Sequence, residues 1–249
     1  MNDQKPLHVR VILAEPAQEG NVGSVCRAMK NFGFDDLVMI NPCNRGDFAK
    51  AMASHAQDLL TDAIIVDTLD RALEGVNLLV GTTGKLGESA REHLRVPCFS
   101  PSELKIMLED KQGTVALLFG REDRGLSREE LERCDVIISI PTSGVYPVMN
   151  LSHAVTVVLY ELSSTTGGEY LLADAGMIEL LHQHLEQLLE HVNHPEHKRD
   201  KTLLMIRRII GRAMLTSHEY FTLIGVLRDI ELALARSRDE CDNSWVENN

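Results

Sequence analysis

The segment from Ile140 to Val155, IPTSGVYPVMNLSHAV, combines residue types that end a strand, form a turn and start a helix. Pro141 ends an apolar run, and Asn150 precedes an apolar helical stretch. An asparagine at the start of a helix caps one free backbone N–H, and the remaining free N–H groups can bind a ligand. The segment is therefore either an ordinary strand-turn-helix corner or one wall of a binding site.

Three glycine-bearing corners are further places where chemistry is expected, because each follows an apolar run of strand type. They are Gly20-Asn21-Val22-Gly23, Gly81-Thr82-Thr83-Gly84 and Gly120-Arg121-Glu122-Asp123-Arg124-Gly125. Open α/β sheets bind ligands at the carboxyl ends of their strands, so a cofactor is expected at these corners. None is a dinucleotide fingerprint, a P-loop or a nucleophile elbow, which argues against a dehydrogenase, an NTPase and an ordinary hydrolase.

Short apolar runs alternate with amphipathic stretches through the first two thirds of the chain, which is typical of an α/β fold with a mostly parallel sheet and helices on both faces. The runs show little alternation, as expected for strands buried on both sides. The predicted strands are Val9–Ala14, Leu37–Ile40, Ala63–Val66, Leu78–Gly81, Val115–Phe119 and Val136–Ile140. The predicted helices between them are Val22–Phe32, Phe48–Ala53, Leu69–Leu73, Pro101–Leu108 and Arg128–Arg133, the last two preceded by the serine of a capping box.

The composition changes after the apolar helix that begins at Leu151, because a polar run from Ser163 to Gly168 predicts a linker. A first domain is thus expected at residues 1–163, followed by a small all-α domain at residues 170–236. The helices predicted there are Asp174–Val192, His197–Leu215 and His218–Ala235. The polar residues 237–249 are predicted to form a disordered tail.

The overall composition is that of a globular protein, with 44% hydrophobic and 25% charged residues. The first residues lack the apolar region of a signal peptide, and no apolar run approaches the roughly 18 residues of a membrane span. A cytoplasmic protein with no membrane partner is therefore expected. The five cysteines are scattered and never in a C-x-x-C spacing, which argues against a disulfide framework and a zinc site.

The overall charge argues against a nucleic-acid partner, whereas one local cluster of basic residues is compatible with such a partner. A formal net charge of -12 gives no support for one, because such proteins present basic surfaces. The helix predicted at residues 197–215 is an exception, and it is either a solvated face or a nucleic-acid contact. Its region carries Lys198, Arg199, Lys201, Arg207, Arg208 and Arg212. The nearby histidines have no matching carboxylate cluster, so no metal site is predicted; they are His182, His184, His191, His194 and His197.

Three motifs, each at a strand end, resemble those of a known family. They are Asn21-Val22-Gly23-Ser24-Val25-Cys26-Arg27-Ala28-Met29, then Leu117-Leu118-Phe119-Gly120-Arg121-Glu122-Asp123-Arg124-Gly125-Leu126, then Ile140-Pro141 with Met149-Asn150-Leu151-Ser152-His153-Ala154-Val155. In this order they look like the motifs of the SPOUT superfamily of RNA methyltransferases, in particular its TrmJ-type tRNA ribose 2′-O-methyltransferases. The resemblance covers the whole first domain, and the Arg207–Ala213 run of the tail is also similar to that subfamily.

The resemblance implies a C-terminal trefoil knot in the first domain, S-adenosylmethionine bound in the loops of the knot, and a homodimer whose sites lie at the subunit interface. General topology rules discard knots, so this expectation comes from the resemblance alone. Most pocket residues would act through backbone groups, which suits glycine corners and apolar strand ends. The implied cofactor-binding residues are Thr82, Thr83, Gly84, Gly120, Ile140, Met149, Asn150 and Leu151.

The resemblance also implies the catalytic residues, which are Arg27, Asn21, Glu122, Asn150 and Ser152. A guanidinium with a pKa above about 12 is a poor base, so Arg27 is expected to hold the phosphate or the 2′-oxygen and align the nucleophile. Glu122, Ser152 and Asn150 are candidates for fixing the target nucleotide or helping proton transfer, and Glu122 could equally order its loop by pairing with Arg121 or Arg124. Ser152 either assists proton transfer or is a first-turn hydroxyl.

Three functions stay open at this point. The first is S-adenosylmethionine-dependent 2′-O-methylation of a tRNA ribose, at nucleotide 32 of the anticodon loop, on cytidine or uridine. The second is the same reaction on ribosomal RNA. The third is a non-catalytic RNA-binding assembly factor that shares the fold.

Overall fold

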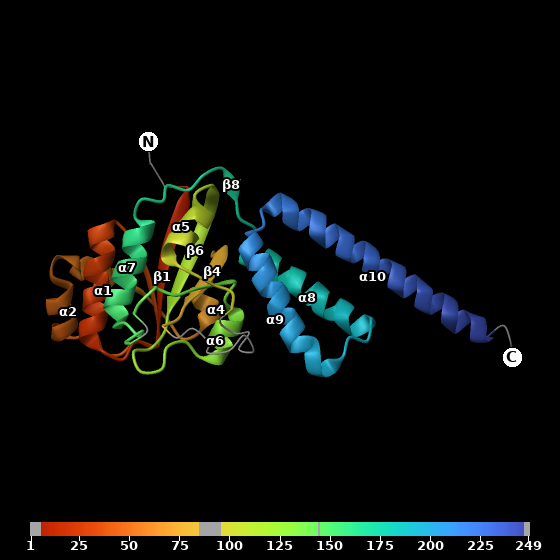
Figure 1. Ribbon diagram of the computed structural model, residues 1–249, viewed down its shortest axis with the longest axis horizontal. Coiled ribbons are helices and arrows are strands. Elements are labelled where there is room, and N and C mark those ends of the chain that lie inside the picture. The colour runs from red at the N-terminus through yellow and green to blue at the C-terminus, as the bar shows by residue number, and fades with distance from the viewer. Residues whose placement is uncertain (1–5, 85–95, 144, 247–249) are drawn as a thin grey trace. The chain divides into compact units, whose positions relative to one another are not determined.

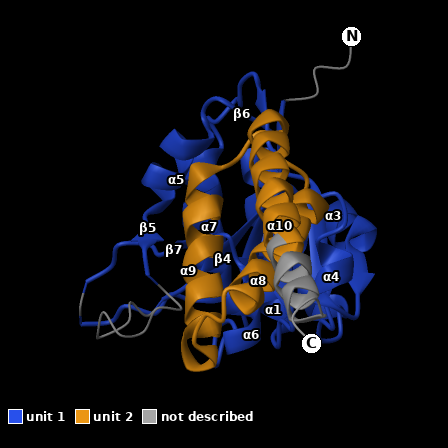
Figure 2. Ribbon diagram, turned by 90° about the vertical axis from the view of Figure 1, so that its right-hand side faces the viewer, with its two compact units in different colours: residues 1–172 blue, residues 173–249 orange. Residues whose placement is uncertain are grey.

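Helices flank a parallel sheet in the first of the two units into which the chain divides (Figure 1). The computed structural model describes residues 6–84, 96–143 and 145–246, with side chains up to residue 236. Unit 1 spans Met1–Leu172 and unit 2 spans Ala173–Asn249 (Figure 2). The sequence-based prediction of an α/β fold with a parallel sheet is confirmed.

Every strand pair among the described residues is parallel. The sheet order is β3-β2-β1-β6-β4-β7-β5, with β8 beside β6. The carboxyl ends of β6, β4 and β7 are therefore neighbours at one edge. The strands are β1 (Leu7–Ala14), β2 (Asp36–Ile40), β3 (Ile64–Val66), β4 (Leu78–Thr82), β5 (Cys98–Phe99), β6 (Lys111–Phe119), β7 (Val136–Ile138) and β8 (Tyr170–Leu171).

Helices α1 and α7 lie side by side on one face of the sheet, and α4 and α6 lie on the other (Figure 1). The helices of unit 1 are α1 (Glu19–Phe32), α2 (Asp47–Ala53), the 3₁₀ turn η1 (Ser54–Ala56), α3 (Gln57–Asp62), α4 (Leu69–Ala72), α5 (Pro101–Leu108), α6 (Arg128–Arg133) and α7 (Leu151–Leu162). Because both faces are covered, the strands are buried on both sides, which explains their nearly uniform apolar sequence.

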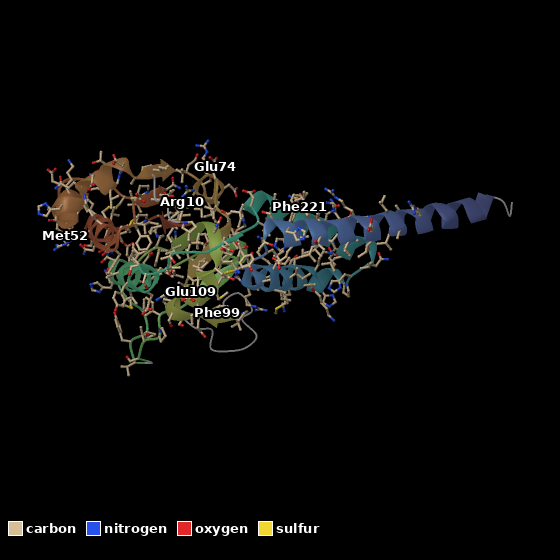
Figure 3. All side chains as sticks on the ribbon, turned by 90° about the horizontal axis from the view of Figure 1, so that it is seen from above. Arg10, Met52, Glu74, Phe99, Glu109 and Phe221 are labelled. Atoms are coloured by element: carbon tan, nitrogen blue, oxygen red, sulfur yellow. The ribbon has the colours of Figure 1, made fainter. Side chains whose placement is uncertain are left out.

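A polar contact beside β1 ties the sheet to the segment after α4. The Arg10 guanidinium donates to the Asp36 carboxylate at 2.8 Å and to the Glu74 carbonyl oxygen at 2.8 Å. Figure 3 shows Arg10 and Glu74 close together on one side of unit 1. Asp36 is the first residue of β2, so this contact does not lie at the carboxyl ends of the strands that carry the predicted site, and it serves the fold.

The predicted strands and helices of the first domain are confirmed, with some ends shifted. Both capping boxes form, at Ser100 with Glu103 and at Ser127 with Glu130. Strand β7 ends at Ile138 rather than Ile140, and β6 begins at Lys111 rather than Val115. The short elements η1, α3, β5 and β8 were not predicted, and β5 and β8, with two residues each, are too short to show any periodicity.

The polar run from Ser163 to Gly168 is packed on unit 1 and is not a free linker. Thr165 is only 6% exposed, and the Gly168 N–H donates to the Lys111 carbonyl oxygen at 2.9 Å. Strand β8 follows, and the buried Leu172 donates its N–H to the Gln112 carbonyl oxygen at 3.0 Å. The unit boundary therefore falls after Leu172 instead of at residue 163.

The described residues of unit 2 form three helices, which are α8 (Ala175–His191), α9 (Glu196–Ala213) and α10 (Ser217–Val246) (Figure 2). A small apolar core joins them, with Leu181 of α8 packed near Tyr220 and Ile224 of α10. Helix α10 continues well past Ala235, so residues 237–246, predicted as a disordered tail, are helical. Residues 247–249 lie outside the described part of the chain.

Candidate active site

A cavity of about 260 Å³ opens at the carboxyl ends of β4, β6 and β7. Its wall comes from the three segments that follow those strands and from the start of α7. Seven of the eight predicted cofactor residues line it: Thr82, Thr83, Gly84, Gly120, Ile140, Met149 and Leu151. The eighth, Asn150, lies between two lining residues and caps α7 by accepting the Ser152 N–H. The structure thus brings the predicted cofactor residues together at one place.

Close backbone approach explains Gly120 of this wall. A Cβ on Gly120 would lie 2.2 Å from the carbonyl carbon of Gly125, so only glycine allows the loop from 120 to 125 to fold back on itself. A Cβ on Gly84 would lie 3.5 Å from the Cα of Val148, which places the β4 corner against the segment after β7. The Thr83 N–H donates to the Ile138 carbonyl oxygen at 3.0 Å and joins the same two segments.

A chain of side-chain hydrogen bonds links four of the five predicted catalytic residues. The Asn21 amide donates to the Glu122 carboxylate at 2.8 Å, and its oxygen accepts from the Asn150 amide at 2.9 Å. The Asn150 oxygen in turn accepts from the Ser152 hydroxyl at 2.8 Å. Asn21 and Ser152 are each 7% exposed, Glu122 is half-buried and Asn150 is exposed, so the chain runs from the interior to the surface beside the cavity wall.

Glu122 is the acidic end of this chain and also lines the cavity. Burial raises the pKa of Glu122, but hydrogen bonds from the Asn21 side chain and the backbone N–H groups of Ala17 and Gln18 outweigh it, and the net pKa lies below the ordinary value. The two backbone distances are 2.9 and 3.2 Å. A carboxylate with these donors is ionised at neutral pH and fixes its loop to the segment between β1 and α1.

Arg27 is the predicted catalytic residue that the structure leaves apart from the others. Its side chain is exposed on α1 and makes no hydrogen bond or ion pair within the described residues, and the residue does not line the cavity of its own chain. Six residues along a helix turn the side chain by about 240° from Asn21, so the two residues point to different sides of α1. Any role of Arg27 in chemistry must involve a molecule or chain that approaches this exposed side.

Sequence reasoning missed Glu15, which follows β1 at the same edge of the sheet. Its Oε2 accepts from Arg121 at 2.9 Å and from Arg124 at 3.1 Å. Glu122 was considered as the partner of these arginines, but it binds backbone N–H groups and Asn21 instead. The position of Glu15 directly after a buried strand was the available signal, because strand ends at this edge converge.

Much of the positive charge of the α9 region is used inside unit 2. Arg199 pairs with Glu190 at 3.0 Å, Arg207 pairs with Glu179 at 2.9 Å, and Arg208 is 1% exposed. Lys198 and Lys201 remain exposed.

Across residues 6–84, 96–143 and 145–246, no group of three or more His, Cys, Asp or Glu is placed to hold a metal ion. No helix in that part of the chain is both long and apolar enough to cross a membrane.

A parallel sheet with a cavity at the carboxyl ends of its central strands, glycine corners and a few converging polar groups is the arrangement in which α/β enzymes bind small-molecule cofactors. The model of the SpoU rRNA Methylase family matches residues 8–160. The chain therefore belongs to the SpoU methylase family within the SPOUT superfamily, and it is a methyltransferase.

Relatives of the chain cover nearly its whole length. It is 36% identical over 229 residues to the tRNA (cytidine-2′-O-)-methyltransferase TrmJ of Methanocaldococcus jannaschii, covering 88% of this chain and 98% of that protein. It is 39% identical over 246 residues to the tRNA (cytidine/uridine-2′-O-)-methyltransferase TrmJ of Escherichia coli K12, covering 90% and 95%. Among solved structures, TrmJ from Z. mobilis ZM4 matches with a TM-score of 0.71 at 28% identity, covering 89% of this chain and 98% of that one.

Proposed function

We propose that this protein transfers the methyl group of S-adenosylmethionine to the 2′-hydroxyl of a tRNA ribose, at nucleotide 32 of the anticodon loop, on cytidine or uridine. The observation that carries the proposal is the single cavity that gathers seven predicted cofactor residues and reaches the hydrogen-bond chain through Glu122. The names of the TrmJ relatives support tRNA as the substrate. Position 32 rests on the resemblance of the three motifs.

The residues of the cavity fit the cofactor. Leu126, Ile138 and Met149 form an apolar surface suited to adenine, and the Gly120 corner exposes backbone groups rather than a side chain. Glu122, which makes no ion pair within the described residues, puts negative charge on the same wall, which suits a sulfonium cation, whereas Asp123 is paired with Arg121 at 3.2 Å. When bound, S-adenosylmethionine supplies an activated methyl group for transfer to an oxygen nucleophile.

Positioning is the contribution we assign to the hydrogen-bond chain. Asn21 and Ser152 are too deeply buried to reach a nucleotide freely, so they hold Asn150 and Glu122 in place. Asn150 is exposed at the start of α7, where it can contact the target ribose. A fixed wall that aligns the two reactants supplies rate enhancement by removing the entropy cost of orienting them.

A homodimer formed through unit 1 completes the proposed site. Arg27 does not line the cavity of its own protomer. In the dimer, Arg27 of one protomer would therefore act at the cavity of the other protomer, across the shared interface. There it would grip an RNA phosphate or the 2′-oxygen, because a guanidinium is an anion binder and not a base. We also propose that the segment carrying β7 and α7 is threaded as the trefoil knot of the superfamily, and that unit 2 contacts tRNA through the exposed side of α9.

Labelled S-adenosylmethionine, total tRNA and ribosomal RNA, followed by mapping of ribose methylation, test the proposal. We expect label at nucleotide 32 of tRNA. Label in ribosomal RNA alone would eliminate the tRNA assignment, and RNA binding without any label would favour a non-catalytic factor. Arg27→Ala should abolish turnover and spare cofactor affinity, whereas Arg71→Ala, which removes an exposed arginine of α4, should leave both unchanged.

A further inference from the structure

Two carboxylates join the loop 120–125 to the segment that follows β1, one extending from each side. Glu122 reaches from the loop 120–125 to the backbone of Ala17 and Gln18. Glu15 reaches back from the end of β1 to the guanidinium groups of Arg121 and Arg124 in that loop. The loop is thus held on both sides by neighbouring acidic residues.

We propose that Glu15 is a positioning residue of the cofactor site, which fixes the loop 120–125 and neutralises its two arginines so that the cavity accepts S-adenosylmethionine. This inference rests on the proposed function, because it assigns Glu15 to the binding of that cofactor. Glu15 itself does not line the cofactor cavity, so it acts through Arg121 and Arg124, which do.

The geometry of Glu15 indicates that its place is fixed by more than its ion pairs. Its backbone has φ +47°, a left-handed conformation that is uncommon for a residue with a side chain. Its N–H donates to the Ile40 carbonyl oxygen at 2.8 Å, so the end of β2 holds the backbone in this conformation. The carboxylate then points at the loop although it is 41% exposed, and both arginines share its Oε2.

The loop that Glu15 holds separates two cavities. Arg121, Arg124 and Gly125 line the cofactor cavity on one side and a second cavity, of about 400 Å³, on the other. The bridge between Arg121 and Gly125 closes the loop, with the Gly125 N–H donating to the Arg121 carbonyl oxygen at 2.8 Å. Movement of the two arginines would therefore change the wall of the cofactor cavity directly.

Charge gives a second reason for the carboxylate. Without Glu15, Arg121 would keep only its ion pair with Asp123, at 3.2 Å, and Arg124 would lose its ion pair, beside a cavity that has to accept a sulfonium cation. The hydrogen bond from Arg121 lowers the pKa of the Glu15 carboxyl, as expected for a carboxylate that compensates a guanidinium. The same arginines would then be free to attract RNA phosphates, so loss of Glu15 should weaken cofactor binding without weakening tRNA binding.

Full-length Glu15→Gln and Glu15→Gly variants test this. Glutamine keeps the size of the side chain and removes its charge, whereas glycine also removes the side chain and is unstrained at positive φ. We expect the Kd for S-adenosylmethionine, measured by calorimetric titration, to rise about 10- to 100-fold, the size of a lost charge-assisted hydrogen bond. The Kd for tRNA should stay the same or fall, with kcat at saturating cofactor largely retained.

Two controls separate positioning from folding. Glu129→Gln removes an exposed carboxylate from the lining of the second cavity that has no hydrogen bond or ion pair within the described residues, and it should leave cofactor affinity unchanged. In a chain that already carries Arg121→Ala and Arg124→Ala, Glu15→Gln should add no further loss. Unchanged cofactor affinity in both Glu15 variants, or equal weakening of cofactor and tRNA binding, overturns the inference. A wild-type protein that does not bind the cofactor overturns the proposed function together with it.

Discussion

Asn21 works in both directions within the hydrogen-bond chain, which restricts the residue that can stand there. Its side chain donates to Glu122 at 2.8 Å and accepts from Asn150 at 2.9 Å. Only an amide offers a donor and an acceptor at these two places, since a carboxylate only accepts. Position 21, in the middle of the hydrogen-bond chain, therefore requires an amide side chain more strictly than the two ends of the chain require a carboxylate and a hydroxyl.

Asn21→Asp should destabilise unit 1 by about 1–3 kcal/mol, because a buried carboxylate would face the carboxylate of Glu122. The loss should be largest above about pH 5, where both groups are ionised, and should shrink at lower pH as one of them takes a proton. Urea unfolding at several pH values measures it. Asn31→Asp, at an exposed site near the end of the same helix, is the matched control and should cost only a few tenths of a kcal/mol.

His182 of α8 is a buried imidazole in unit 2 whose Nε2 has no partner in the described part of the chain. Burial lowers the pKa of His182 to about 4, and the nearby Arg207 acts in the same direction. The unfolded chain binds this proton near pH 6.5 and the folded chain does not, so the stability of unit 2 falls as the pH drops from about 6.5 to about 4. Above this window the stabilising contribution is complete.

Replacing His182 with leucine should remove this pH dependence. A shift from the ordinary value of 6.5 to about 4 corresponds to a difference on the order of 3 kcal/mol across the window. Thermal unfolding of wild-type and His182→Leu proteins at pH 7.5 and pH 4.5 should show the variant losing less stability on acidification. His197→Leu, on an exposed part of α9, controls for the loss of a histidine; a parallel loss in all three proteins would contradict the expectation.

Residue types at the site were predictable from the sequence, but their connections were not. Glu122, Asn21 and Asn150 each stood in a motif at a strand end, yet their mutual hydrogen bonds depend on segments more than 100 residues apart in the chain. Glu15 lay in none of the three motifs. Its role depends on the position of the loop 120–125 in the folded chain, which the local sequence around Glu15 does not determine.

At the scale of elements, the contact of α1 with α2 depends on a glycine. A Cβ on Gly23 would lie 2.1 Å from the carbonyl oxygen of Ala49 and 2.9 Å from the amide nitrogen of Ala53, both backbone atoms. Backbone cannot move aside as a flexible side chain can, so the helices would have to separate. Because α1 also carries Asn21, this packing fixes the position of a middle member of the hydrogen-bond chain.

Gly23→Ala should therefore lower the melting temperature of unit 1. Alanine gains about 1 kcal/mol of helix propensity, but overpacking against backbone costs about 1–3 kcal/mol or more, so the loss prevails. Gly225→Ala in α10 is the control, because its added Cβ meets no atom within 4 Å and should stabilise by up to about 1 kcal/mol. Calorimetry of both variants should give shifts of opposite sign.

Elements with a local signal were predicted well. The two capping boxes and the Asn150 cap form as expected, since their hydrogen bonds join residues two or three apart. Strands β5 and β8 contain two residues each and exist only because distant strands pair with them. The polar composition of Ser163 to Gly168 suggested a linker, because its packing depends on contacts with Lys111, which is about 50 residues away in the sequence and does not show in the local composition.

At the scale of the whole molecule, the cofactor cavity belongs to unit 1 alone. All of its lining residues lie between Thr82 and Val158, and of the hydrogen-bond chain only Asn21, on α1, lies outside that range. The cavity exists because β6, β4 and β7 are neighbours in the sheet. The alternation of predicted strands and helices in the sequence does not specify this strand order. Removal of unit 2 should thus leave cofactor binding intact, while our proposal for α9 expects tRNA binding to weaken.

Two truncations distinguish the observed unit boundary from the one expected by composition. A chain ending at Leu172 keeps the pairing of β8 with β6 and the bond from the Asn77 side chain to the Leu172 carbonyl oxygen at 3.1 Å. A chain ending at Ser163 loses these and the burial of Leu172, which alone is worth about 1.5–3 kcal/mol. Urea unfolding should show a lower midpoint for the shorter chain, and calorimetric titration should show wild-type affinity for S-adenosylmethionine in the longer one. Equal midpoints would mean that residues 164–172 contribute nothing to unit 1 and would return the boundary to residue 163.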